Sequence, residues 1–495
     1  MFPVAGRANH DRTQPQQTGG LGPPPHGGFD RGYYAGETIY RVTIKTERMA
    51  PTRRQSLAGT GAVVGTVGVS GAAAARVTVE EIETVEPSPG TWPTDRYDGG
   101  NTATNPHASP PSDPEIDWRV PVDADNAWED GFVVGPIRVY HAGTRLTALD
   151  RADGTRRWSR NEPSGTLAVR DGTLYHCHGG DDSSLPRLSS FNARRGGPRW
   201  RTDVPEDSHG LTVTANRVFV AGRAFDAEDG RLEWTLEGNV NPGWTDSVAQ
   251  DGFLYADHSA RRVSKYSARS VLDETLNRGS QPIWQRRHDR PYTYTVVQDD
   301  RLVRTRGTTV GGAALAGFDT ETGRRTWAAL TSEEFKSATD TEPGDPDHFG
   351  VTTSGQAVTS EQCIVVAGTV SYGRSEEARK QTSALVAVSL SDGTVRWTRS
   401  FLRPDHPAEQ GVGSVVVADG TVLVTVKESM PAYGQREEPP YPGRILALDA
   451  DTGETLWGIK IDHRPRQLAV ADDTIFAITD GKSDSEDSTA VFALR

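Results

Sequence analysis

The chain has few cysteines and few lysines. Among 495 residues it has only two cysteines, Cys177 and Cys363, and lysine makes up seven of the 54 basic residues. The cysteines lie in different copies of the repeat described below, so no disulfide is expected, and we interpret both as small buried strand residues. No CxxC pair is present, which excludes the usual structural zinc site.

The sequence also lacks the short motifs of several enzyme classes. It contains no GxSxG elbow, no Walker loop, no HExxH and no CxxCH haem-attachment site. No segment of the repeat region has a sustained helical period, which argues against an α/β or all-α fold there. The pattern of the whole chain is therefore more informative than any single motif.

Positive charge is scarce outside the N-terminal region. The net charge is −13, although the first 75 residues carry eight Lys and Arg against only four Asp and Glu. The acidic remainder argues against nucleic acid and anionic membranes as partners. An acidic, Lys-poor and Arg-rich composition is typical of proteins from salt-loving, GC-rich organisms.

The first 75 residues resemble export machinery more than a folded domain. Residues 1–48 are rich in Gly, Pro, Gln and charge, and we expect a disordered leader or sequence upstream of a true start at Met49. Residues 49–75 resemble a twin-arginine signal, with Arg53-Arg54, small residues and an Ala73-Ala74-Ala75 cleavage site. An extracellular or cell-surface protein is therefore expected.

An alternative interpretation of residues 58–75 is a retained transmembrane anchor. The stretch is long enough, but it consists mostly of Gly, Ala, Thr and Val, which favours a cleaved signal and a mature chain without a membrane span. No cysteine follows it, so lipid attachment there is excluded. Residues 76–114 are predicted to form a linker rich in Pro, Ser, Thr, Asp and Asn.

One feature recurs through most of the chain: a glycine followed four residues later by a tryptophan. The clearest copy is ALDADTGETLW, which ends at Trp457. Four more good copies end at Trp158, Trp234, Trp327 and Trp397; a weaker copy ends at Trp200 and a degraded one at Trp284. The glycines of the five good copies are Gly154, Gly230, Gly323, Gly393 and Gly453. Such a repeat predicts the architecture before any single residue is interpreted.

The repeats predict an eight-bladed, all-β propeller over residues 115–495. Apolar residues alternate with period two and Asp-Gly turns separate the runs, which is typical of short antiparallel strands, four to a blade. The last repeat, residues 467–495, has only three strands, whereas a lone strand, residues 115–120 with Trp118, precedes the first repeat. Pairing that strand with residues 490–494 would complete the eighth blade and hide two sheet edges.

This pattern resembles the tryptophan-docking motif of pyrroloquinoline-quinone-like (PQQ-like) propeller repeats, over residues 113–495. In that family the tryptophan packs between blades, near the glycine of a neighbouring motif. The resemblance implies a structural role for the five glycines and for Trp118, Trp158, Trp200, Trp234, Trp284, Trp327, Trp397 and Trp457. Residues 91–106 resemble the lead-in segment of exported quinoprotein-like propellers. The same ring serves dehydrogenases and non-catalytic scaffolds, so the fold alone does not decide the function.

Residues just before the innermost strand of each predicted blade should surround one mouth of the central channel. In the quinoprotein enzymes this position holds the cofactor, where Trp244 could stack on a planar ring and Asp246 could act as base or metal ligand. The alternative is a hydrated channel rim. The candidate residues are Trp128, His209, Trp244, Asp246, Tyr292, His348, His406, His463 and Arg464.

Two polar clusters are not interpreted as metal sites. His176 and His178 would share one face of a strand, opposite Cys177, although Asp181 and Asp182 follow closely. The acidic residues near position 485 lack the glycine placement of a calcium loop. We therefore predict no metal site and interpret the acidic residues as a solvated hairpin tip.

Two functions of different classes remain compatible with the sequence. The first is an exported, monomeric, non-catalytic propeller that binds a protein or cell-surface ligand; in repeat design it resembles the propeller subunit of the outer-membrane barrel-assembly machinery. The second is a PQQ-dependent dehydrogenase with calcium and cofactor at the channel mouth. The chain lacks the adjacent cysteine pair typical of PQQ alcohol dehydrogenases, so the first is preferred. A carbohydrate-active propeller has no positive support.

Overall fold

A computed structural model describes most of the repeat region. The described residues are 82–123, 131–179, 186–205, 210–236, 247–259, 261–268, 279–288, 292, 294–306, 308–310, 312–339, 349–371, 383–401, 412–427, 443–479 and 489–495. All of them belong to one compact unit, residues 62–495. The predicted leader and export signal lie outside the described residues.

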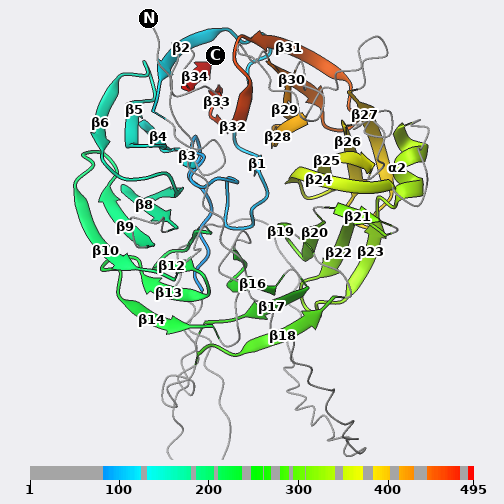
Figure 1. The fold of residues 1–495 in the computed structure, drawn as a ribbon, viewed down its shortest axis with the longest axis horizontal. Coiled ribbons are helices and arrows are strands. Elements are labelled where there is room, and N and C mark those ends of the chain that lie inside the picture. The colour runs from blue at the N-terminus through cyan, green and yellow to red at the C-terminus, as the bar shows by residue number, and fades with distance from the viewer. Residues whose placement is uncertain are drawn as a thin grey trace, which may run out of the picture. The chain divides into compact units, whose positions relative to one another are not determined.

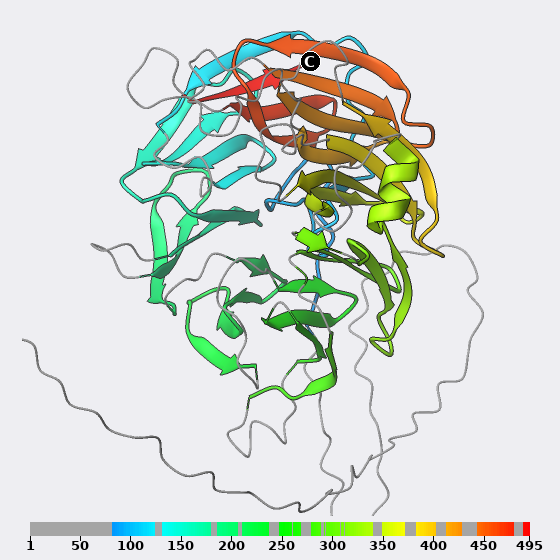
Figure 2. The ribbon, with the colours of Figure 1, turned by 45° about the vertical axis from the view of Figure 1, so that its right-hand side comes forward.

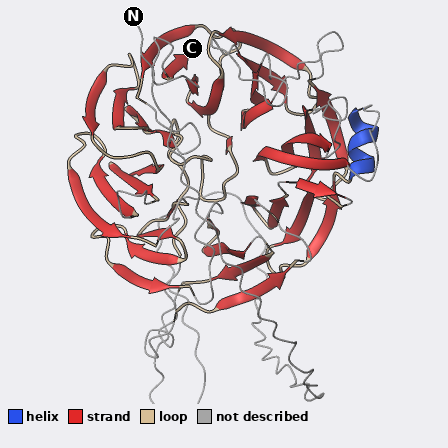
Figure 3. Ribbon diagram, viewed as in Figure 1, coloured by secondary structure: helices blue, strands red, loops and turns tan. Residues whose placement is uncertain are grey.

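Eight β-sheets follow one another around a ring, which confirms the predicted eight-bladed, all-β propeller (Figure 1). Nearly all regular structure is strand (Figure 3). We name the sheets blades A to H in ring order. Each has four antiparallel strands, ordered from the channel outward, so that the fourth lies at the rim.

The strands of blades A to D are as follows. Blade A contains β3 (Gly131–Val134), β4 (Arg138–Ala142), β5 (Leu146–Asp150) and β6 (Arg156–Arg160). Blade B contains β7 (Thr166–Arg170), β8 (Thr173–His178), β9 (Arg187–Asn192) and β10 (Pro198–Asp203). Blade C contains β11 (Thr212–Val213), β12 (Arg217–Val220), β13 (Arg223–Asp226) and β14 (Leu232–Thr235). Blade D contains β15 (Val248–Gln250), β16 (Phe253–Ser259), β17 (Arg262–Tyr266) and β18 (Pro282–Arg287).

Blades E to H complete the ring. Blade E contains β19 (Tyr294–Gln298), β20 (Arg301–Thr305), β22 (Leu315–Asp319) and β23 (Arg325–Ala329). Blade F contains β24 (Phe349–Val358), β25 (Gln362–Ser371), β26 (Ser383–Ser389) and β27 (Val395–Ser400), extended by β21 (Thr308–Val310). Blade G contains β28 (Val412–Ala418), β29 (Thr421–Lys427), β30 (Gly443–Asp449) and β31 (Thr455–Ile461), extended by β1 (Thr104–Asn105). Blade H contains β32 (Pro465–Ala471), β33 (Thr474–Thr479), β34 (Ala490–Leu494) and β2 (Ile116–Pro121).

The two chain ends close blade H as predicted. Strand β2 pairs antiparallel with β34, with Trp118 opposite Ala493 and Arg119 opposite Phe492. Beyond the strands, Glu115 and Arg495 exchange two backbone hydrogen bonds of 2.9 and 3.1 Å. The pairing covers an edge that would otherwise leave unpaired backbone groups exposed.

In blades B and G the turn between the first and second strands has the sequence Asp-Gly. Asp171 and Gly172 both have positive φ angles, 46° and 72°, and Asp419 and Gly420 repeat this with 43° and 71°. Two successive left-handed residues define the turn that matches the twist of a tight hairpin, and Gly and Asp adopt it at low cost.

One short helix, α2 (Ser332–Thr339), lies in the link between blades E and F. The sequence pattern did not predict it. Thr331 and Glu334 form a reciprocal cap: the Glu334 N–H donates to Thr331 Oγ1 at 3.2 Å and the Thr331 N–H donates to Glu334 Oε2 at 2.8 Å. Within the described residues, no helix has the length and apolar character needed to span a bilayer.

The segment predicted to be a linker lies inside the ring. Residues 82–109, named the strap here, cross the inner strands near one end of the channel, and β1 within them adds a parallel strand to blade G (Figures 1 and 2). The strap side chains Ile82 and Trp92 are fully buried, and Tyr97 is 2% exposed. The strap is therefore part of the core, although its polar composition does not suggest this.

Candidate functional site

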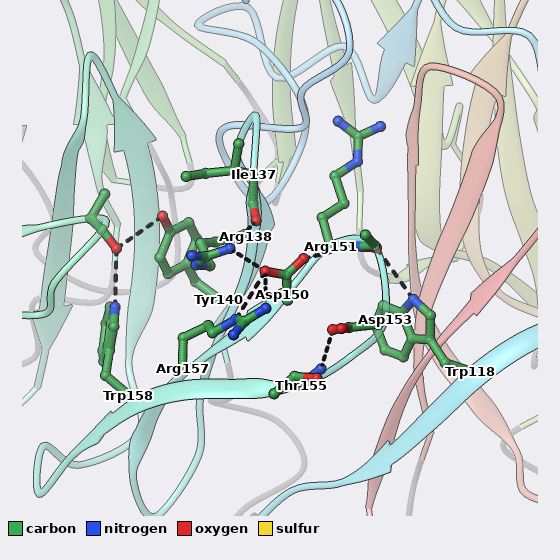
Figure 4. A network of polar contacts seen from close by, with 12 residues as sticks. Trp118, Ile137, Arg138, Tyr140, Asp150, Arg151, Asp153, Thr155, Arg157 and Trp158 are labelled. Atoms are coloured by element: carbon green, nitrogen blue, oxygen red, sulfur yellow. Dashed lines mark hydrogen bonds and ion pairs between the residues drawn. The ribbon is translucent and has the colours of Figure 1, made fainter.

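The recurrent tryptophans lie between neighbouring blades. Trp118 of blade H packs on the turn of blade A, and its indole N–H donates to the Arg151 carbonyl at 3.3 Å (Figure 4). A Cβ placed on Gly154 would lie only 2.8 Å from the Trp118 ring, so the ring requires a glycine there. In the same turn Asp150 accepts from Arg138 and Arg157.

Six interfaces share this geometry, which we name a dock. In each, an indole N–H donates to a carbonyl of the next blade at 2.8–3.3 Å, and a turn glycine lies so close that a Cβ would meet the indole at 2.4–2.9 Å. The pairs are Trp118–Gly154, Trp158–Gly196, Trp200–Gly230, Trp284–Gly323, Trp327–Gly393 and Trp397–Gly453. Gly196 belongs to the weak copy and was not among the glycines selected from the sequence.

The motif aspartate stabilises the turn that carries the docking glycine. In the clearest copy Asp449 Oδ1 accepts from the Thr452 N–H at 2.8 Å and from the Thr452 hydroxyl at 2.9 Å. These hydrogen bonds hold the pKa of Asp449 below its ordinary value. The Asp-x-x-Thr-Gly pattern therefore makes a rigid turn on which a neighbouring indole rests.

Two interfaces lack a dock. At the C/D interface Trp234 is buried, but its indole nitrogen has no hydrogen-bond partner. Blade D has Ser280 at the position where the other motifs have glycine. At the G/H interface the turn that should receive Trp457 is the junction of Glu115 and Arg495. The ring therefore consists of two docked halves of four blades, H-A-B-C and D-E-F-G.

The strap bonds to all eight blades near the carboxyl ends of their inner strands. Carbonyls of Glu83, Trp92, Pro93, Gly99, Gly100, Thr102 and Ala103 accept N–H groups of blades C, A, B, D, E, F and G at 2.8–3.0 Å. The Asn105 side chain donates to the Val470 carbonyl of blade H at 2.8 Å. The candidate mouth residues precede the inner strands, so the strap lies at the opposite end of the channel.

Close backbone approach explains the Gly99-Gly100 pair in the strap. A Cβ on Gly99 would lie 2.4 Å from the Ala249 carbonyl oxygen, and one on Gly100 would lie 2.4 Å from the Val297 carbonyl oxygen. Asp98, just before them, accepts from the N–H and the hydroxyl of Thr102 at 2.8 and 2.7 Å. Loss of bulk water around Asp98 raises the pKa of its carboxyl to about 6.

The structure describes three of the nine candidate mouth residues. Trp128, His209, Trp244, Asp246, His348 and His406 lie outside the described residues. His463 is buried and Arg464 is half-buried, both directly before β32. Tyr292 precedes β19 of blade E, which is not a neighbour of blade H, so the described candidates do not form one group.

Tyr292 belongs to a cationic cluster between blades D and E that the sequence pattern did not predict. The guanidinium carbons of Arg304 and Arg306 lie 4.9 and 4.7 Å from its ring centroid, and His288 and Phe318 contact it edge-on. Arg306 Nη2 also donates to the Tyr292 hydroxyl at 3.3 Å. Tyr292 is 2% exposed, so its ring offers no free face for stacking.

A fully buried ion pair lies beside this cluster and joins the two blades. Arg304 Nη2 of blade E lies 2.5 Å from Asp257 Oδ1 of blade D, and neither side chain has exposed surface. Thr295 donates to Asp257 Oδ2 at 3.0 Å and accepts from Arg304 Nε at 3.1 Å. Burial raises the pKa of Asp257, against the opposing effects of Arg304 and Thr295. The available sequence signal was the pair Arg304 and Arg306, two residues apart, which follows the apolar residues Leu302 and Val303.

The other polar residues noted in the sequence are buried. His176 and His178 share a face of β8, with ring centroids 5.6 Å apart, and burial lowers the pKa of His176 to about 3. Asp181 and Asp182 lie outside the described residues. Within the described residues, no group of three or more His, Cys, Asp or Glu side chains could hold a metal ion. Cys177 and Cys363 are buried and form no disulfide, and burial raises the pKa of Cys363 to about 12.

A family profile matches residues 142–270 and 275–494, and that family is described as outer membrane protein assembly factor BamB. The chain belongs to this family. The match covers most of the chain and contains the PQQ-like repeats whose docks are described above. The family supports the propeller and its docking motif; it does not distinguish a scaffold from a dehydrogenase.

Other similarities are partial. Two quinohemoprotein alcohol dehydrogenases, ADHIIG from Pseudomonas putida HK5 and the enzyme from Comamonas testosteroni, superpose with TM-scores of 0.54 and 0.51. Each is 14% identical and covers 83% of this chain and 81% of its own, which shows the fold alone. Serine/threonine-protein kinase AfsK of Streptomyces coelicolor is 26% identical over 152 residues, 29% of this chain, and this chain spans only 18% of the kinase.

Proposed function

We propose that the protein is an exported, non-catalytic scaffold that binds a protein or another cell-surface ligand at the mouth opposite the strap. Membership of the assembly-factor family supports a scaffold. The observation that supports this choice is the environment of Tyr292, since two guanidinium groups and two aromatic rings already surround this candidate ligand-binding residue.

Tyr292, the aromatic residue among the described mouth candidates, gives no support to a quinone cofactor at this mouth. A planar cofactor would need an open aromatic face, and Tyr292 has none. Arg304 Nη1 is buried without a hydrogen-bond partner, but Arg304 is fully enclosed beside Asp257 and presents no accessible guanidinium to an anionic ligand. We therefore derive no reaction step through such a cofactor.

A cofactor titration separates the two functions. Purified protein is titrated with PQQ and calcium while absorbance is followed, and dye-linked oxidation of alcohols and glucose is assayed in parallel. We expect no saturable absorbance change and no dye reduction. If PQQ bound to the Tyr292→Ala variant but not to the unmodified protein, the Tyr292 ring would be identified as the barrier to cofactor binding. Tight binding with dye reduction by the unmodified protein would overturn the proposal.

Site-specific photo-crosslinking locates the binding face. A photoreactive residue replaces Asp462, which is exposed in the link that leads to the mouth end of β32, and in a matched variant it replaces Asp171, which is exposed in a turn at the strap end. We expect capture of a cell-surface component only from position 462. Equal capture from both positions, or capture only from position 171, would contradict the proposed binding face.

A further inference from the structure

The C/D interface lacks both the indole hydrogen bond and the glycine contact of a dock. Among the described residues, the Trp234 indole makes no hydrogen bond there, and the rims of the two blades are joined by the backbone bridge between Leu236 and Ser280. The apolar cluster there contains ten buried residues, and one of them is Ile82 of the strap. A residue from outside the repeats thus completes the core of this interface.

The other undocked interface is packed differently. Trp457 at G/H packs against a much larger apolar cluster, which continues through blades G and H and includes Val415 and Leu468 together with the strap residues Trp92 and Tyr97. Because aliphatic burial contributes about 25 cal/mol per Å², a large continuous cluster can replace one docked indole. C/D is therefore the weaker of the two interfaces between the halves.

The strap bonds to both halves of the ring. Glu83, Trp92, Pro93 and Asn105 bond to the half H-A-B-C. Gly99, Gly100, Thr102 and Ala103 bond to the half D-E-F-G. Any separation of the halves at C/D must break one of these two sets.

The strap is held in its conformation by the ring. Tyr97, Asn101 and Ala103 have φ angles of 75°, 58° and 52°, in the left-handed region that costs a non-glycine residue on the order of 1 kcal/mol or more. A short segment with this strain keeps its conformation only while its contacts persist. Release is therefore expected to involve the segment as a unit.

From these observations we propose that the strap is a conformational latch: it holds the C/D interface closed, and the ring opens there, between two four-bladed halves, when the strap is released. The inference does not depend on the proposed function. It assigns the strap the role that a Trp–Gly dock has at six other interfaces. Opening would widen the channel at one side while the three docks within each half stay formed.

Hydrogen exchange in a strap variant tests this proposal. In Gly99→Val/Gly100→Val the new side chains would clash with the Ala249 and Val297 carbonyls, and no docking residue is changed. We expect amide exchange in the rim strands β14 and β18 to accelerate at least tenfold, with the rim strands β23 and β27 beside the docked E/F interface unchanged. The matched control is Gly197→Ala, because a Cβ at Gly197 meets no atom within 4 Å.

Two further variants keep the test decisive. If the double variant does not fold, Ile82→Ala removes the strap side chain from the C/D cluster alone and should accelerate the same strands to a smaller extent. A disulfide between Leu236→Cys and Ser280→Cys should restore protection in the strap variant. Equal acceleration in all eight blades, or no acceleration at C/D, would overturn the proposal.

Discussion

Blade D is bound to its two neighbours in different ways. Towards blade E it has the Trp284 dock, the buried Asp257–Arg304 pair and Lys265, whose Nζ donates to the Thr320 carbonyl at 3.1 Å. Towards blade C it has an unbonded Trp234, one backbone bridge and a side chain from the strap. Blades of similar strand topology therefore differ in cohesion, because the docking turn of one blade serves the tryptophan of the preceding one.

The difference follows from a single degraded repeat. The copy that ends at Trp284 keeps its own tryptophan, so blade D docks on blade E. It has lost the glycine turn, so blade C has no dock on blade D. Loss of a motif thus weakens the interface before the repeat and spares the interface after it.

The largest expected effect comes from breaking the D/E ion pair. Asp257→Asn leaves the Arg304 guanidinium buried without a counter-charge, which should lower the free energy of unfolding by about 3–5 kcal/mol. Asp300→Asn is the control, since the Asp300 carboxylate is 72% exposed beside Arg301 and should matter by less than about 1 kcal/mol. Urea unfolding followed by circular dichroism measures both. Equal losses would show that the D/E pair has no special role.

A smaller effect should distinguish docked from undocked tryptophans. Trp327 and Trp234 are both 6% exposed, but only the Trp327 indole donates a hydrogen bond, to the Leu390 carbonyl at 2.8 Å. Phenylalanine at either position removes similar volume. Trp327→Phe should therefore destabilise the protein by about 1 kcal/mol more than Trp234→Phe, measured by the same unfolding experiment. If Trp234→Phe cost as much or more, the absence of a bond at C/D would be immaterial.

The smallest expected effect is a pH dependence of the strap. The folded-state pKa of Asp98 is raised from 3.8 to about 6. Its contribution to the free energy of unfolding is therefore most favourable below pH 4 and is lost as the pH rises through 6. The charges that influence it are Glu86 and Arg96, both within the strap. The melting temperature of Asp98→Asn, relative to that of the unmodified protein at the same pH, should therefore be higher at pH 7 than at pH 4.5. A difference that does not change with pH would show that Asp98 does not titrate in the strap.

The sequence predicted the fold because each docking motif is local in sequence, although the dock itself joins two blades. A Gly-x-x-x-Trp spacing within one blade specifies both the turn and the indole, so the blade count and the closure through Trp118 followed from counting motifs. The strap could not be predicted in this way. Its bonds use backbone carbonyls of residues 83–103, and backbone bonding leaves almost no signature in side-chain pattern except the Gly99-Gly100 pair.

The candidate mouth was harder to predict than the fold. Placing residues before each inner strand identified Tyr292, but the sequence could not show that Arg304 in the adjacent strand and Arg306 just after it would enclose the ring. Asp257, the partner of Arg304, comes from another blade, 47 residues away. Contacts between blades depend on which strand face meets the neighbour, and a periodic pattern does not specify the polar pairs formed there.

The exchange rates of the tryptophan indole protons test most directly whether docked and undocked interfaces differ. With selective ¹⁵N labelling of tryptophan, each indole N–H gives one resonance that single Trp→Phe variants assign. We predict slow exchange for Trp118, Trp158, Trp200, Trp284, Trp327 and Trp397, and markedly faster exchange for Trp234. Exchange of Trp234 as slow as that of the six docked indoles would contradict this prediction.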